Sequence, residues 1–164
     1  MSAVPQPRQR TLLPMHAAHL DAVMAIEVGA YAFPWSRGNF VDSLAAGYDA
    51  RVLYDDAGDI LGYFVAMAGV DEMHLLNITV APPAWHQGHA RFMLEALADL
   101  CRQRNANQLW LEVRESNERA RAIYLRHGFT EVGKRRGYYP DAHGRREDAV
   151  VMSLAIEGGS RGLE

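Results

Sequence analysis

Residues 74–101 read HLLNITVAPPAWHQGHARFMLEALADLC, and this stretch decides the fold. It begins with an apolar run that is typical of a buried β-strand, and Ala81-Pro82-Pro83 ends that run. After the loop around Gly88, apolar residues recur at helical spacing, at Met93, Leu94, Leu97, Leu100 and Cys101. The stretch therefore predicts a buried strand, a loop and a long helix in succession.

Strands and helices continue to alternate on both sides of this stretch. Before it we expect a short strand ending at Pro14, a helix that begins near Leu20 and ends at Gly29 or soon after, a helix capped by Ser36, and a hairpin of residues 51–54 and 60–67. After it we expect a strand over 109–113, a helix that Asn117 caps and that runs to His127 before Gly128, and strands over 129–136 and 149–156 separated by an irregular segment. The predicted fold class is α/β (an α+β mixed sheet), with six to seven strands and helices on both faces.

Length and composition limit the class of protein. The chain has 164 residues, against ~100–200 for a typical domain, so we expect one domain over 11–156 with flexible ends at 1–10 and 157–164. Hydrophobic residues make up 49% and charged residues 23% of the chain, which excludes wholesale disorder. The net charge of −3 favours neither a nucleic-acid partner nor an anionic membrane.

Cysteine content and hydropathy indicate the compartment. Cys101 is the only cysteine, so an intrachain disulfide is excluded and a reducing compartment fits. The first ten residues lack the apolar region of a secretory signal. The longest apolar stretch, residues 61–70, is shorter than the ~20 residues of a membrane span. We therefore expect a cytoplasmic protein with no membrane partner.

The loop over residues 84–91 is a candidate phosphate site. It lies between a predicted strand and a predicted helix, where backbone N–H groups and the positive helix end face one point. Gly88 allows a ligand to approach the backbone closely, and Ala90 is small. The alternative is an ordinary strand-to-helix turn that binds nothing. Since no Walker lysine follows, nucleotide hydrolysis is not expected.

Glu112 is a candidate catalytic carboxylate. Strand alternation places Trp110 and Glu112 on one face and the aliphatic residues at 109, 111 and 113 on the other. Burying a carboxylate beneath a helix is costly unless the group is paired or used in chemistry. The alternative is a structural ion pair with an arginine such as Arg114.

Asn117 and Tyr124 lie seven residues apart on one predicted helix. At 100° per residue this is within about 20° of two full turns, so their side chains share a face. Tyr124 is either a core residue with its hydroxyl hydrogen-bonded or a general acid. No metal site is expected, because His86 and His89 have no third ligand nearby in the sequence.

These segments together resemble the GNAT-type N-acetyltransferases over nearly the whole chain. The resemblance rests on the strand 76–80, the loop 87–90, the strand 110–114, Ser116-Asn117, and the segments 122–124 and 127–129. More narrowly, the segments 32–36, Asn77-Ile78, the strand 110–114, 138–140 and 146–149 are similar to the bacterial ribosomal-protein alanine N-acetyltransferases.

The resemblance implies a GNAT-like fold, with acetyl-CoA as the donor. The implied acceptor is the α-amine of the N-terminal Ala of a ribosomal protein, the eighteenth of the small subunit, which attacks directly in a ternary complex. Glu112 takes the position of the general base and Tyr124 that of the general acid. The residues implied to bind the donor are Ile78, Thr79, Val80, His86, Gln87, Gly88, His89, Ala90, Arg91 and Asn117.

The sequence departs from the family pattern at two places. The loop has Trp85 and His86 where the family usually has Gln or Arg followed by a basic residue, and Ala90 where Gly is usual. One extra residue lies around 143–145. Because backbone amides make most contacts with a pyrophosphate, we still expect the loop to bind it.

Two aromatic segments, Phe33-Pro34-Trp35 and Tyr138-Tyr139-Pro140, are expected in loops. We expect Phe33, Pro34, Trp35, Tyr138 and Tyr139 to flank the acceptor cleft; the alternative is that both segments only cover the core. The alternative functions are acetylation of a polyamine, a lysine or a small antibiotic, and a CoA-binding module without turnover. The presence of both Glu112 and Tyr124 disfavours the module.

Overall fold

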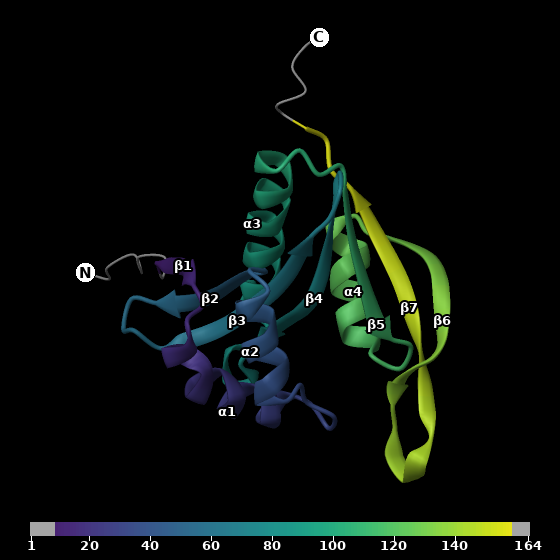
Figure 1. The fold of residues 1–164 in the computed structure, drawn as a ribbon, viewed down its shortest axis with the longest axis horizontal. Helices are drawn as coiled ribbons and strands as arrows, with labels where there is room; N and C mark the ends of the chain where they lie inside the picture. Colours follow the sequence, from purple (N-terminus) through teal and green to yellow (C-terminus); the bar gives the residue numbers. More distant parts are fainter. Residues whose placement is uncertain (1–8, 159–164) are drawn as a thin grey trace, which may run out of the picture.

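A mixed β-sheet forms the centre of the computed structural model, which describes residues 9–158 (Figure 1). Its seven strands lie in the order β1-β2-β3-β4-β5-β7-β6, and only β4 and β5 are parallel neighbours. The strands are β1 (Arg10–Pro14), β2 (Asp49–Asp55), β3 (Ile60–Ala68), β4 (Glu72–Val80), β5 (Gln108–Arg114), β6 (Thr130–Pro140) and β7 (Arg146–Ala155). The predicted mixed sheet is confirmed.

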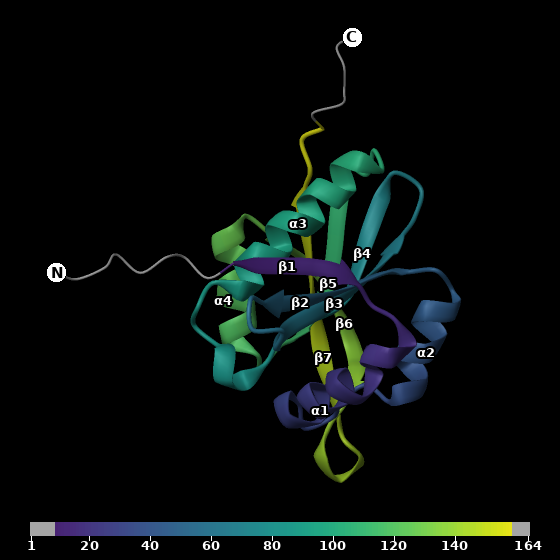
Figure 2. The same ribbon diagram turned by 90° about the vertical axis from the view of Figure 1, so that its left-hand side faces the viewer.

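Helices cover both faces of the sheet, as expected. They are α1 (Leu20–Ala30), α2 (Arg37–Ala45), α3 (His89–Gln103) and α4 (Glu118–His127), with 3₁₀ turns at Ala17–His19, Pro82–Ala84 and Ala142–Gly144. Figure 2 separates α3 and α4, at upper left, from α1 and α2, at lower right. Phe64 of β3 packs in the core with α3, whereas its neighbour Tyr63 packs with α1 and α2. Because side chains alternate along β3, this one strand contributes to a hydrophobic core on each face of the sheet.

Local capping signals set the ends of the helices. The Ser36 hydroxyl accepts the N–H of Asn39 at the start of α2, and the Asn117 side chain accepts the N–H of Ala120 at the start of α4. Gly128 ends α4 in the left-handed conformation. These caps were predicted. No helix among residues 9–158 is both long and apolar enough to cross a membrane.

The parallel strands β4 and β5 separate along their length. They pair only between residues 72–75 and 108–111, and beyond Leu75 strand β4 pairs with β3 alone. A register shift in the β3–β4 ladder leaves Leu76 without a partner residue. The two strands therefore diverge toward their carboxyl ends (Figure 1). Beyond Leu75, β4 therefore has no strand partner on the side that faces β5.

The segment after residue 136 differs from the expectation. Strand β6 continues to Pro140 and pairs with β7, so Tyr138-Tyr139-Pro140 lies in a strand and the predicted loop is wrong. Gly137 has a φ of +57° and donates its N–H to Asp148 Oδ1, which accommodates a bulge without ending the pairing. Pro140 is tolerated because β6 is an edge strand.

The sheet reaches nearly to both ends of the described residues. Strand β1 already includes Arg10, one residue before the expected domain start, and β7 ends at Ala155. The predicted flexible ends fall mainly on residues 1–8 and 159–164, which lie outside the described residues.

Candidate active site

A cavity of about 370 Å³ occupies the gap between β4 and β5. It brings together both proposed catalytic residues and several proposed donor-binding residues, although they are far apart in the sequence: Ile78, Thr79, Val80, Ala90, Glu112, Asn117 and Tyr124. Trp35 and Tyr139 also line it, whereas Phe33, Pro34 and Tyr138 do not. The divergence of the two parallel strands is therefore what creates this first cavity.

Glu112 is nearly buried, with 7% of its side chain exposed, and has two partners. His74 Nε2 lies 2.5 Å from its Oε1, and Arg135 Nε lies 3.4 Å from its Oε2. The expected alternative, an ion pair with Arg114, is wrong. Arg114 instead donates to Glu147 Oε1 at 3.0 Å. Glu112 also lines the first cavity.

Arg114 joins the two aromatic segments that are far apart in the sequence. Its guanidinium carbon lies 5.3 Å from the ring centre of Phe33 and 4.6 Å from that of Tyr139. These distances are in the range of cation–π contacts. Trp35 has a further role, because it packs against the buried Phe40 at a ring distance of 5.0 Å. The segment around Trp35 thus both covers the core and borders the first cavity.

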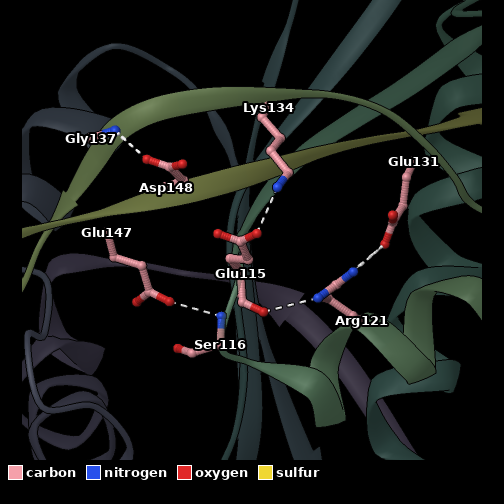
Figure 3. A network of polar contacts seen from close by, with 8 residues as sticks. All are labelled: Glu115, Ser116, Arg121, Glu131, Lys134, Gly137, Glu147 and Asp148. Carbon is pink, nitrogen blue, oxygen red and sulfur yellow. Dashed lines mark hydrogen bonds and ion pairs between the residues drawn. The ribbon is translucent and has the colours of Figure 1, made fainter.

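Polar contacts fasten the β6–β7 hairpin to the turn between β5 and α4 (Figure 3). Glu147 accepts the backbone N–H of Ser116 at 2.8 Å. The Glu115 side chain accepts from Lys134, while its backbone oxygen accepts from Arg121. The hydrogen bond from Ser116, joined by that from Arg114, holds the pKa of Glu147 below its usual value. The hairpin that carries Tyr139 is thereby held beside the cavity.

Tyr124 of α4 and Asn117, the N-cap residue of that helix, both line the first cavity. The Tyr124 ring packs against Phe129, with the ring centres 5.6 Å apart. Among residues 9–158 its hydroxyl has no hydrogen-bond partner, so the alternative of a tied-off core hydroxyl is wrong. Burial, together with nearby Tyr31 and Tyr139, raises the pKa of Tyr124. The hydroxyl is therefore protonated at neutral pH and is available as a proton donor.

The loop between β4 and α3 borders a second cavity of about 670 Å³. His86 and Gly88 both have left-handed backbones, with φ values of +64° and +82°, and α3 begins directly after them. This second cavity is lined by His86, Gly88, His89, Ala90 and Arg91 among others, but not by Gln87, which contacts His89 instead. The first-turn amides of a helix have no partner within the helix, which suits an anionic ligand.

Trp85 and Arg119 stand where the two cavities meet. Both residues line both cavities, as do Val80, Ala90 and Ile123. The indole N–H of Trp85 donates to the carbonyl oxygen of Val80 at 2.8 Å, and the Arg119 guanidinium carbon lies 3.8 Å from the Trp85 ring centre. The sequence analysis did not single out Arg119, because its contact with Trp85 depends on how α4 packs beside the loop.

A buried carboxylate, Glu27, links α1 to β3 and β4 beneath the first cavity. Only 1% of this residue is exposed. It accepts hydrogen bonds from the Tyr63 hydroxyl, the Trp35 backbone N–H and the Asn77 side chain at 2.7, 2.9 and 3.2 Å. Tyr31, on the segment that follows Glu27, is tied to β4. Its hydroxyl contacts both Thr79 Oγ1 and the carbonyl oxygen of residue 78. Burial raises the pKa of Tyr31 to about 12.

Within residues 9–158 no group of three or more His, Cys, Asp or Glu side chains is arranged to hold a metal ion. Cys101 is buried in the core side of α3, and burial raises the pKa of its thiol to about 11. A thiol with that pKa is a poor nucleophile at neutral pH.

Comparison with known proteins agrees with this geometry. The family model described as "Acetyltransferase (GNAT) family" matches residues 20–129. The chain belongs to the GNAT acetyltransferase family. A relative from Escherichia coli named [ribosomal protein bS18]-alanine N-acetyltransferase is 39% identical over 146 residues, which is 89% of this chain and 97% of the relative. A relative of the same name from Haemophilus ducreyi is 36% identical over 83% of this chain and 93% of that protein.

Solved structures of GNAT enzymes share the fold. The crystal structure of the ribosomal-protein-S18-alanine N-acetyltransferase from Escherichia coli superposes with a TM-score of 0.83 at 36% identity, over 95% of this chain and 99% of that one. Nourseothricin acetyltransferase superposes with a TM-score of 0.76 at 22% identity, over 90% of this chain and 99% of that one. The similarity to nourseothricin acetyltransferase shows a shared fold alone. A GNAT fold does not by itself identify the acceptor amine.

Proposed function

We propose that this GNAT enzyme transfers the acetyl group of acetyl-CoA to the α-amine of the N-terminal Ala of the ribosomal protein bS18. The observation that carries the proposal is the placement of Glu112 and Tyr124 in one cavity that joins the cavity of the β4–α3 loop. The acceptor is supported by the names of the relatives, which match this chain over almost their whole length. Such an acceptor is a cytoplasmic protein, which makes the cytoplasm the proposed site of action.

Acetyl-CoA fits the two joined cavities. Its phosphates suit the second cavity, where Gly88 has no side chain and the first turn of α3 offers backbone amides. The pantetheine arm then passes the junction at Trp85 and Arg119 and follows β4 along Ile78, Thr79 and Val80, which do not pair with β5. His86, His89, Ala90, Arg91 and Asn117 are proposed to border this donor site, and Gln87 to support it through His89.

Glu112 and Tyr124 are proposed to move the two protons of the reaction. Glu112, through a water molecule, takes a proton from the acceptor ammonium, whose pKa of about 7.7–8.0 makes this step modest at neutral pH. The free amine attacks the thioester carbonyl, and a strand N–H near Ile78–Val80 stabilises the charge that develops on its oxygen. Tyr124 gives its proton to the departing thiolate sulfur. Nitrogen gains the acetyl group as the carbon–sulfur bond breaks.

The acceptor is proposed to enter beside the two aromatic segments. Trp35 and Tyr139 line the first cavity, and Phe33 and Tyr139 enclose Arg114. Pro34 and Tyr138 are proposed to shape the entrance around them. A cavity bordered by such rings favours a short extended N-terminus with a small first side chain. A hydrophobic pocket discriminates by only ~1–3 kcal/mol per methylene, so we expect Ala to be preferred over bulky first residues rather than used alone.

A panel of acceptors tests the proposal. The purified enzyme and acetyl-CoA are incubated with peptides that carry the N-terminal residues of bS18 and differ at position one, and with spermidine, free lysine and an aminoglycoside. Release of free CoA thiol gives the rate, and tandem mass spectrometry gives the acetylated atom. We expect the Ala-starting peptide to be the best acceptor and its α-amine to be the site. Preference for spermidine, a lysine ε-amine or the antibiotic would overturn the acceptor, and no turnover of any amine would favour a binding module.

A further inference from the structure

His74 contacts the proposed general base from outside the first cavity. It lies on β4 opposite Trp110 in the parallel ladder, and Glu112 is two residues further along β5 on the same face. His74 Nε2 is 2.5 Å from Glu112 Oε1. Glu112 lines the first cavity and His74 does not. The His74 imidazole therefore contacts the Glu112 carboxylate from the part of β4 and β5 that is paired. The first cavity lies where the two strands have separated.

No other group holds Glu112 as closely among the described residues. Arg135 of β6 lies 3.4 Å from Oε2 and is half exposed, so it is more strongly solvated than His74. Arg114, the next charged residue on β5, is held by Glu147. Tyr138 and Tyr139 face the same carboxylate, and their hydroxyls are neutral because burial and then neighbouring charges raise their pKa values.

The two contacts leave Glu112 able to act as a base. An ionised carboxylate offers about four lone-pair positions, and His74 and Arg135 occupy one each. A nearly buried carboxylate needs such partners, because desolvation without them disfavours its charged form. A hydrogen bond from His74 also restricts the rotation of the side chain. The remaining lone pairs can then face the water or amine in the cavity.

We propose that His74 is a positioning residue for Glu112. This inference rests on the proposed role of Glu112. The imidazole donates its Nε2–H to Oε1 and fixes the orientation of the carboxylate.

Two substitutions at position 74 test the proposal in the full-length enzyme. His74→Ala removes the N–H and should lower kcat by about tenfold, less than the ~10²–10⁴-fold that a general base itself contributes, while KM for acetyl-CoA changes little. His74→Gln places an amide N–H near the position of Nε2, so it should restore most of kcat.

A double-mutant cycle separates positioning from a general structural role. If His74 acts through Glu112, His74→Ala should cause no further loss in a Glu112→Gln background. His16→Gln, a substitution of an exposed histidine before α1, is the control and should match the wild type. Thermal unfolding checks that each variant is folded.

The outcomes are distinguishable. A His74→Ala variant with the kcat of the wild type would overturn the proposal, as would an equal loss in the Glu112→Gln background. A His74→Gln variant as slow as His74→Ala would also overturn the proposal, because a hydrogen bond to the carboxylate would then not explain the loss. Full activity of the Glu112→Gln single variant would instead overturn the proposed role of Glu112 itself.

Discussion

The Arg119 guanidinium lies over the ring of Trp85, with its central carbon 3.8 Å from the ring centre. The contact joins the first turn of α4 to the loop before α3 at the point where the two cavities meet. The contact holds the positive charge of Arg119 at the junction of the two cavities. A ligand whose phosphates lie in the second cavity would pass this charge on its way into the first. Stacking on the indole restricts the guanidinium without neutralising it.

Arg119→Gln should therefore lower kcat/KM for acetyl-CoA, because it removes a positive charge that is proposed to interact with the phosphates of the donor. A hydrogen bond to a charged group contributes about 1.5–3 kcal/mol, which corresponds to a loss of about 10- to 100-fold in kcat/KM. S-acetylpantetheine, which lacks the pyrophosphate, should be used equally well by the variant and the wild type. The measurement is the steady-state rate with each donor, and an equal loss with both would show that Arg119 does not act on the phosphates.

Two further variants complete this test. Trp85→Gln leaves Arg119 in place and should reduce acetyl-CoA affinity only modestly, because the backbone of the loop makes most of the contacts. Arg37→Gln removes an exposed arginine that pairs with Asp21. This control should have the donor kinetics of the wild type.

Gly88→Val should nearly abolish acetyl-CoA binding. Gly88 has a φ of +82°, which a β-branched residue adopts only with strain, and it lines the second cavity. The added Cβ would meet no protein atom within 4 Å, so the side chain would occupy open space that is proposed for the donor. Isothermal calorimetry with acetyl-CoA should show a loss of about 100-fold or more, larger than a single hydrogen bond explains.

Gly47→Val is the matched control for backbone strain. Gly47 also has a left-handed backbone, with a φ of +77°, and open space around its Cβ position, but it lines neither cavity. This variant should be less stable and should still bind acetyl-CoA. Tight binding by Gly88→Val would remove the loop from the donor site.

Tyr124→Phe should lower turnover while leaving donor binding intact. Phenylalanine preserves the ring contact with Phe129 and removes only the hydroxyl. The expected loss in kcat is about 10²–10⁴-fold, as for other general acids, and the Kd for acetyl-CoA should be nearly unchanged. Tyr54→Phe, which changes a tyrosine beside His19, should have no effect. If Tyr124→Phe turns over at the rate of the wild type, water or another residue protonates the thiolate.

Glu147 should contribute stability that depends on pH. Its hydrogen bonds with Ser116 and Arg114 lower its pKa in the folded state. The stabilisation is therefore complete above the unfolded pKa of about 4.3 and is lost as pH falls through the lower folded value. Glu147→Gln should reduce the free energy of unfolding by about 1 kcal/mol at pH 7, since the pair is partly solvated.

Urea denaturation at several pH values measures this effect. The difference between the wild type and Glu147→Gln should shrink as pH falls below about 4 and should vanish once Glu147 is protonated in the folded state as well. A difference that stays constant from pH 7 to pH 3 would mean that Glu147 acts through packing rather than through its charge.

Local signals explain how much of the fold was predictable. The caps at Ser36 and Asn117 and the left-handed Gly128 act within a few residues, so the sequence identifies them directly. The shared face of Asn117 and Tyr124 also follows from helix geometry alone. By contrast, β6 passes through Gly137 because of pairing with β7 and a hydrogen bond from Gly137 to Asp148, and neither is local in sequence.

The same distinction applies to the candidate site. Glu112 and Tyr124 were predictable from residue type and periodicity. The partner of Glu112 was not, because the contact with His74 depends on the register between β4 and β5. Arg119 was missed for a similar reason, since the packing of α4 against the loop brings it to Trp85.

The pH dependence of Glu112→Gln tests the central claim most directly. The measurement is kcat/KM for the Ala-starting peptide, for the variant and the wild type, from pH 7 to pH 9.5. If Glu112 is the general base, the variant should lose about 10²–10⁴-fold at pH 7 and recover part of that loss as the α-ammonium, with a pKa of about 7.7–8.0, deprotonates in solution. A loss that is the same at every pH, or no loss at all, would contradict the role of Glu112 as the base for acetyl transfer.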